Sequence, residues 1–94
     1  MRDPMPRRVQ VEAQVMEVDL GDERVLLDLR AGTYFGLNEV GGRIWSLLSQ
    51  DGCLEGAFRG LQGTYDVSDE VLRADFETFV RLLLSRGLVH ALDA

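Results

Sequence analysis

The stretch that decides the fold is residues 24–48, RVLLDLRAGTYFGLNEVGGRIWSLL, because the spacing of its apolar side chains changes at Asn38. Before Asn38 apolar residues alternate, as they do in a half-buried strand, and after it they recur every three or four residues, as in a helix. The alternating residues are Val25, Leu27 and Leu29, and the helical ones are Val40, Ile44, Leu47 and Leu48. Asn38 is itself a favoured helix N-cap. The stretch predicts two strands, the second over residues 33–37, followed by a helix over residues 39–50.

Upstream of this stretch the alternation continues and predicts a further strand. Val9, Val11 and Val15 occupy odd positions, whereas Val18 and Leu20 occupy even ones. This change of phase predicts a bulge or bend near Val15. Gly21-Asp22 is a two-residue turn signal that joins its flanking strands as a hairpin. We therefore expect residues 14–37 to form a three-stranded antiparallel meander, with residues 33–37 as an edge strand.

Two more helices are expected downstream. The first is short and weak, because glycines interrupt the apolar face of residues 54–61. The second runs over residues 69–86, with a cap supplied by Asp66-Val67-Ser68 and a stop at Gly87. Residues 88–91 either return as a short strand or cover the core. The predicted fold class is α+β: winged-helix-like, with an N-terminal three-stranded antiparallel sheet followed by three helices.

Length and composition predict one domain. Ninety-four residues build a single modest core. Residues 1–8, with two Pro and three Arg, are expected to be a flexible tail, and residues 9–94 a single domain. No stretch approaches the roughly 18 apolar residues of a membrane span, and the N-terminus lacks the apolar run of a signal peptide. We therefore expect a cytoplasmic protein that has no membrane partner.

The net charge of −6 argues against nucleic acid as a partner, because phosphate backbones are bound through cations. Between Asp66 and Glu77 the third predicted helix carries five acidic residues and Arg73 alone as a base. The fold class leaves a winged-helix DNA-binding regulator as the alternative function, and this charge disfavours it. Asp75 is set apart because it falls on the apolar stripe of the helix, either at the rim of the core or facing a partner.

Residues for catalysis are scarce. Cys53 precedes the second helix, and His90 is the sole histidine, so the sequence contains one Cys/His pair for a thiol-dependent enzyme. No third group is present to orient that pair. The single cysteine also excludes an intramolecular disulfide and a Cys-rich zinc site. We expect no catalytic residues, no metal and no cofactor.

Residues 27–48 resemble the signature of PqqD-like proteins, in the branch found in lasso-peptide biosynthesis. The shared features are Asp28-Leu29, Gly32, Tyr34, Leu37-Asn38 and Ile44-Trp45, and they continue through Tyr65-Asp66-Val67 and Arg86-Gly87-Leu88-Val89. The resemblance covers roughly residues 15–90. Gly56 and Gly60 depart from it, since relatives usually have better helix formers there.

The resemblance implies a RiPP recognition element, a stand-alone domain that binds the leader segment of a ribosomally synthesised precursor peptide. In that family the leader adds as a strand beside the third strand of the sheet, and its side chains enter a cleft against the third helix. The partners that the resemblance implies are the precursor leader, a transglutaminase-like leader peptidase and an asparagine-synthetase-like cyclase.

The residues expected to bind the peptide lie on the edge strand and on the third helix. The strand contributes Thr33, Tyr34, Phe35, Gly36 and Leu37. The helix contributes Leu72, Phe76, Phe79, Val80 and Leu83 as apolar contacts, and Asp69, Arg73 and Asp75 as polar ones. Which of the two phenylalanines faces the cleft stays open. Because an edge strand offers unpaired backbone groups, we expect a proline at position 35 to block peptide binding and to leave the fold largely intact.

Overall fold

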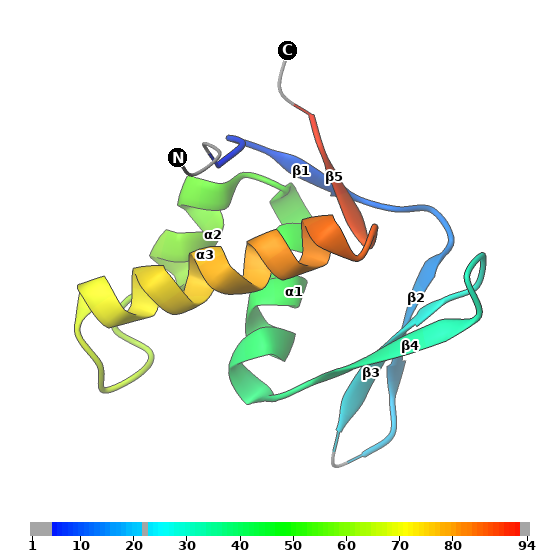
Figure 1. Cartoon of the computed structure of the whole chain (residues 1–94). Coiled ribbons are helices and arrows are strands. Elements are labelled where there is room, and N and C mark those ends of the chain that lie inside the picture. Colours follow the sequence, from blue (N-terminus) through cyan, green and yellow to red (C-terminus); the bar gives the residue numbers. More distant parts are fainter. Residues whose placement is uncertain (1–4, 22, 93–94) are drawn as a thin grey trace.

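The computed structural model describes residues 5–21 and 23–92, which form an α+β domain of three helices and two small antiparallel sheets (Figure 1). The strands are β1 (Val9–Val11), β2 (Val15–Asp19), β3 (Arg24–Asp28), β4 (Thr33–Leu37) and β5 (Val89–Ala91), and the helices are α1 (Glu39–Asp51), α2 (Leu54–Leu61) and α3 (Asp69–Ser85). The predicted fold class is confirmed. The predicted helix bounds differ from these by no more than a residue or two.

The larger sheet has the order β2-β3-β4, so β4 is an edge strand, as the meander predicted. Asp28 shapes the turn before β4, because its carboxylate accepts hydrogen bonds from the backbone N–H groups of Arg30 and Ala31, both at 3.1 Å. The change of phase near Val15 is a bend, one of the two expected alternatives: the chain turns at residues 13–14, and the Val15 N–H donates to the Glu12 carbonyl at 3.1 Å. There the chain leaves one sheet for another, since β1 pairs with β5.

Caps and glycines define the helix ends. The Asn38 side chain accepts a hydrogen bond from the Gly41 N–H at 2.7 Å, and Ser68 caps α3 in the same way through the Val71 N–H at 3.2 Å. Gly52 ends α1 with a φ of 28°, and its carbonyl accepts a bond from the Val9 N–H at 2.9 Å. A side chain at position 52 would overlap the Val9 carbonyl oxygen, so glycine is required there.

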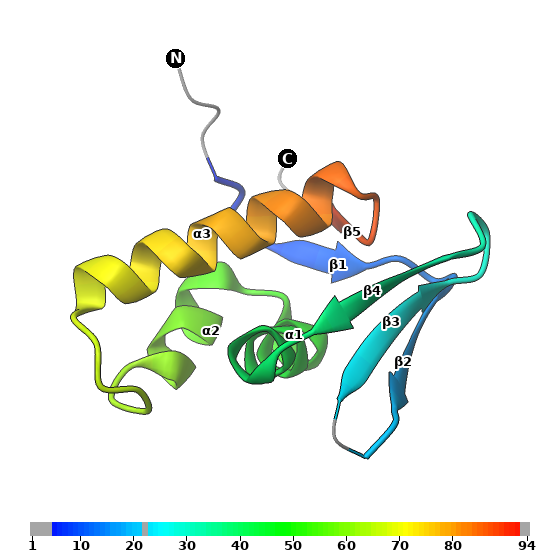
Figure 2. The ribbon, with the colours of Figure 1, turned by 60° about the horizontal axis from the view of Figure 1, so that its bottom comes forward.

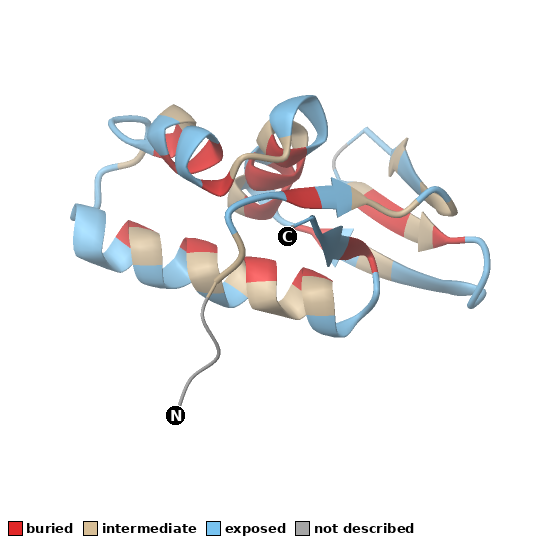
Figure 3. Ribbon diagram, turned by 90° about the horizontal axis from the view of Figure 1, so that it is seen from above, coloured by how far each residue is buried: buried red, intermediate tan, exposed pale blue. Residues whose placement is uncertain are grey.

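The core lies where the helices meet one another and the inner face of the larger sheet. The buried positions of α3 lie along the side of the helix that faces α1 and α2 (Figure 3). The three-stranded sheet extends to one side of this helical body, and β4 leads directly into α1 (Figures 1 and 2). Leu26 and Leu37 cover the core from the sheet, and both are buried.

Contacts with the domain begin before the expected boundary at residue 9. The Met5 side chain packs against the core, the carbonyl of Arg7 accepts a hydrogen bond from Leu54, and the carbonyl of Arg8 accepts one from Leu92, both at 3.0 Å. Residues 5–8 therefore pack on the domain, because their backbone pairs with segments beside α2 and β5. The rest of the expected tail, residues 1–4, lies outside the described residues.

Candidate functional site

The free edge of β4 presents the backbone groups of Tyr34 and Gly36. Hydrogen-bonded and non-hydrogen-bonded pairs alternate along an antiparallel ladder. Two backbone bonds show which pairs of the β2–β3 ladder are hydrogen-bonded. Leu20 N–H donates to the Glu23 carbonyl at 2.8 Å, and Leu29 N–H donates to the Gln14 carbonyl at 3.0 Å. By the same alternation, the β3 residues at positions 24, 26 and 28 point their backbone N–H and C=O groups toward β4. Their partners at positions 37, 35 and 33 therefore point their N–H and C=O groups inward, and Tyr34 and Gly36 point theirs outward.

A cleft of about 410 Å³ lies beside this edge, between β4, the start of α1 and one face of α3. Its apolar lining residues are Phe35, Val40, Ile44, Phe79 and Leu82, and the others are Gly36, Asn38, Gly41, Asp75 and Thr78. Asp75 is the one charged residue among them. The α3 residues of the lining share one helical face, because their spacings are close to multiples of a turn.

The Phe79 ring forms the floor of the cleft, and the fold holds it from two sides. Its centroid lies 6.3 Å from that of Phe35 on β4, with the ring planes tilted by 54°. On the other side it packs against the first turn of α1, where a β-carbon on Gly41 would lie 3.3 Å from the ring. Glycine at position 41 thus permits the close approach of α1 and α3.

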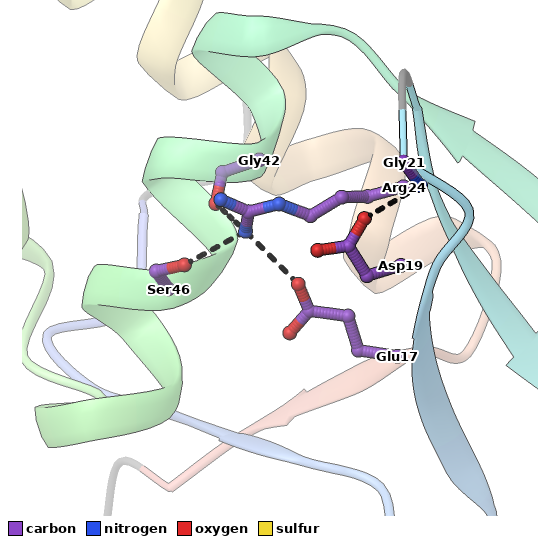
Figure 4. A network of polar contacts seen from close by, with 6 residues as sticks. All are labelled: Glu17, Asp19, Gly21, Arg24, Gly42 and Ser46. Carbon is purple, nitrogen blue, oxygen red and sulfur yellow. Dashed lines mark hydrogen bonds and ion pairs between the residues drawn. The ribbon is translucent and has the colours of Figure 1, made fainter.

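Arg24 fixes the sheet relative to α1 (Figure 4). Its Nη1 donates to Glu17 Oε2 at 2.9 Å on the neighbouring strand, and to Ser46 Oγ at 3.1 Å and the Gly42 carbonyl at 3.4 Å on the helix. Because Arg24 pairs with Leu37 at the end of β4, this network lies at the junction where the edge strand enters α1. It therefore ties the sheet to the first turns of α1.

The residues expected to bind the peptide separate into three groups. Phe35, Gly36, Asp75 and Phe79 line the cleft, and Thr33 and Tyr34 are exposed on the edge strand. The others on the strand and in the apolar part of α3 are buried in the core and are not among the residues that line the cleft: Leu37, Leu72, Phe76, Val80 and Leu83. The sequence left open which of Phe76 and Phe79 faces the cleft, and of the two it is Phe79 that lines it. The Phe76 ring packs at 5.7 Å from Phe58 of α2, and the Phe79 ring faces β4.

Asp69 and Arg73 lie on the side of α3 that faces α2. The Asp69 carboxylate accepts a hydrogen bond from Gln62 at 3.0 Å. The Arg73 guanidinium lies over the Phe58 ring, 4.1 Å from its centroid, and forms an ion pair with Glu55 at 3.0 Å. The hydrogen bond from Arg73 lowers the pKa of the Glu55 carboxyl below its usual value. These two residues join α3 to α2 and do not line the cleft.

Six lining residues were not expected from the sequence: Asn38, Val40, Gly41, Ile44, Thr78 and Leu82. Those of α1 were missed because their place depends on how the helix packs against α3. A signal for Leu82 was present, since it lies seven residues after Asp75 and thus on the same helical face.

The outer face of the larger sheet is apolar. The register brings Met16, Leu27 and Tyr34 into one row across it, and Val18, Val25 and Gly36 into the next. Tyr34 is 73% exposed and Met16 50%. Val25 is only 9% exposed, yet it lies outside the core cluster, as expected for a side chain covered by its own neighbours on this face. We call these six residues the outer face.

The two candidate catalytic residues, His90 and Cys53, have different surroundings. His90 Nδ1 lies 2.7 Å from the Glu12 carboxylate, and Cys53 is half-buried at the start of α2. Within the described ranges, no three His, Cys, Asp or Glu side chains are grouped so as to hold a metal ion. Among residues 5–21 and 23–92 there is also no helix long and apolar enough to cross a membrane.

Comparison with known proteins identifies relatives of this domain. The model of the family described as Coenzyme PQQ synthesis protein D (PqqD) matches residues 23–89. A solved structure described as TbiB1 in complex with the TbiA(beta) leader peptide superposes with a TM-score of 0.78, at 36% identity, over 85% of this chain and 93% of that one. A second, a lasso peptide synthetase B1 complexed with the leader peptide, also gives 0.78, over 87% of this chain and 96% of that one. Its identity of 22% supports the shared fold alone. No curated protein matches the sequence significantly.

Proposed function

Because this chain belongs to the PqqD family, we propose that it is a RiPP recognition element that binds the leader segment of a precursor peptide, in the lasso-peptide branch. The observation that carries the proposal is the free edge of β4 beside an apolar cleft. The 36% identical relative whose structure contains a leader peptide supports the same function. The domain acts by binding and contributes no catalytic group.

The leader adds to β4 as a fourth strand of the larger sheet. The outward N–H and C=O groups of Tyr34 and Gly36 pair with its backbone and provide affinity that does not depend on sequence. Alternate leader side chains then point into the cleft, where Phe35, Phe79 and Leu82 offer apolar contacts. Selectivity comes from this second set of contacts.

The test is a calorimetric titration with the leader of the precursor encoded beside this chain, with the TbiA(beta) leader and a scrambled leader for comparison. We expect micromolar or tighter binding of the first and none of the scrambled peptide. Amide hydrogen exchange gives the second readout. The amides of Tyr34 and Gly36 should become protected on binding, whereas those of Leu26 and Phe35 are protected already by the ladder. A folded protein that binds no leader would refute the proposal.

The leader peptidase docks on the outer face. An exposed apolar face free of charge marks a protein-binding surface. It adjoins the proposed leader site, because Tyr34 contributes its side chain to the face and its backbone to the free edge. A peptidase bound there lies beside the leader that it cleaves. The cyclase receives the product afterwards, and we expect these steps in the cytoplasm.

Met16→Glu tests this docking, because it places a charge on the outer face without touching the free edge or the cleft. It should weaken peptidase binding in a pull-down or titration and leave leader affinity unchanged. Retained peptidase binding would exclude the outer face. If light scattering shows that the wild type alone dimerises and the variant does not, the face joins two copies of this chain instead.

DNA binding has no support from the geometry. The exposed side of α3 away from the cleft carries Asp69, Glu70 and Glu77 beside Arg73 and Arg81, so it offers no basic surface to a phosphate backbone. A salt-dependent shift of duplex DNA by the purified protein would revive this alternative.

A further inference from the structure

Two opposite charges flank the apolar part of the cleft: Asp75 lines it, and Arg86 lies outside its lining, over the Phe35 ring. Asp75 lines the cleft one turn before Phe79. Arg86 follows the last turn of α3, with its guanidinium 5.6 Å from the Phe35 ring centroid. Among residues 5–21 and 23–92, neither Asp75 nor Arg86 has an ion-pair partner. Apolar side chains separate the two charges, chiefly Phe79 and Leu82.

The direction of this polarity relative to β4 follows from the contacts of the Phe79 ring. That ring touches both β4, through Phe35, and the start of α1, at Gly41. Along α3, Asp75 comes before Phe79, and Arg86 comes after it, beside Phe35. Figures 1 and 2 agree that β4 and α3 run in opposite directions. The chain of β4 therefore passes from the arginine end of the cleft toward the aspartate end.

The spacing of residues 75 and 86 along the axis of α3 can be expressed in residues of an extended peptide. Asp75 and Arg86 are eleven residues apart on a helix, which is about 16 Å at about 1.5 Å per residue. An extended strand covers that span in about five residues at about 3.3 Å each. Side chains on one face of a strand recur at even spacing, so the matching peptide positions are separated by four or by six.

We propose that this charge polarity selects the leader and sets its direction, an inference that rests on the proposed function. The bound leader carries a basic residue opposite Asp75 and an acidic residue opposite Arg86. It runs antiparallel to β4, as every pair in this sheet does, so the basic residue comes first and the acidic one follows four or six positions later. Opposite charges brought together at these two exposed positions stabilise the complex, and the reversed order places like charges together.

The test is a charge scan of the leader encoded beside this chain, with Lys and then Glu placed at each position in turn. Affinities are measured by titration with the wild type, Asp75→Lys and Arg86→Glu. The matched controls are Glu77→Lys, on the side of α3 away from the cleft, and Arg59→Glu, on α2. Each control makes the same charge change outside the site, so it measures the effect of net charge alone.

We expect the wild type to favour Lys over Glu by about three- to tenfold at one position, and this preference to reverse in Asp75→Lys alone. The wild type should favour Glu over Lys at a second position, four or six residues toward the C-terminus, and Arg86→Glu should reverse that preference. The inference is overturned if neither variant changes a preference, if the controls change it equally, or if the second position lies on the N-terminal side. In those cases the leader still binds and the proposed function stands. Absence of binding by any leader would remove both.

Discussion

A proline at Gly36 is predicted to remove leader binding without unfolding the domain. The alternation of the β3–β4 ladder directs the Gly36 N–H to the free edge, so the substitution costs no bond within the sheet. Proline is tolerated on an edge strand when its nitrogen faces solvent. A β-carbon at position 36 meets no atom within 4 Å, so the first carbon of the ring has room. We expect the free energy of unfolding to change by less than about 1 kcal/mol.

The effect on binding follows from what the ring displaces. The leader loses one backbone hydrogen bond, worth about 1 kcal/mol net. The ring also occupies the place of the amide hydrogen, where a leader carbonyl would approach to about 3 Å, so the neighbouring bond at Tyr34 is weakened as well. Together these losses amount to about 2 kcal/mol, which is about a thirtyfold weaker Kd.

The assay pairs a calorimetric titration with urea unfolding, and Gly36→Ala is the matched control. Alanine adds a side chain but retains the N–H, so its leader affinity should stay within about twofold of the wild type. A folded Gly36→Pro that binds the leader within about threefold of the wild type would refute strand addition at β4. The proline expected from the sequence at Phe35 is the poorer choice, because that N–H belongs to the ladder and the substitution would remove a hydrogen bond within the sheet.

Three further predictions concern the framework of the site. Gly41→Ala should lower leader affinity about threefold, because its β-carbon would lie 3.3 Å from the Phe79 ring and displace it, while the gain in helix propensity keeps stability within about 1 kcal/mol of the wild type; an unchanged titration would contradict this. Gly52→Ala should reduce the free energy of unfolding by about 2 kcal/mol or more in urea, since its φ is 28° and its β-carbon would overlap the backbone of β1. Because Arg73 lowers the pKa of Glu55, the ionised pair stabilises the fold above the ordinary value of 4.5 and is lost as pH falls through the lowered pKa. Glu55→Gln should therefore flatten the acid side of the stability profile, measured by urea unfolding between pH 3 and 6.5, and an identical slope would show that the pair contributes nothing.

Local signals in the sequence determined most of the elements of this domain. The change of apolar spacing at Asn38 marks the passage from β4 to α1, and its side chain caps that helix as expected. Gly87, with a φ of 72°, lies just beyond the end of α3. The edge position of β4 was also accessible, because consecutive strands joined by tight turns pair in order. Each of these depends on residues close together in the chain, and for that reason they could be predicted.

Only the tertiary structure decided which face of α3 serves the core and which serves the cleft. The helix has two apolar stripes, one through Phe76 and one through Phe79, and helical periodicity treats them alike. Their difference arises from distant residues. The stripe of Phe76 meets α2, whereas Phe79 fits against β4 because Gly41 lets the first turn of α1 approach it. The pairing of β1 with β5 is of the same kind, since it joins the two ends of the domain through contacts that no local pattern records.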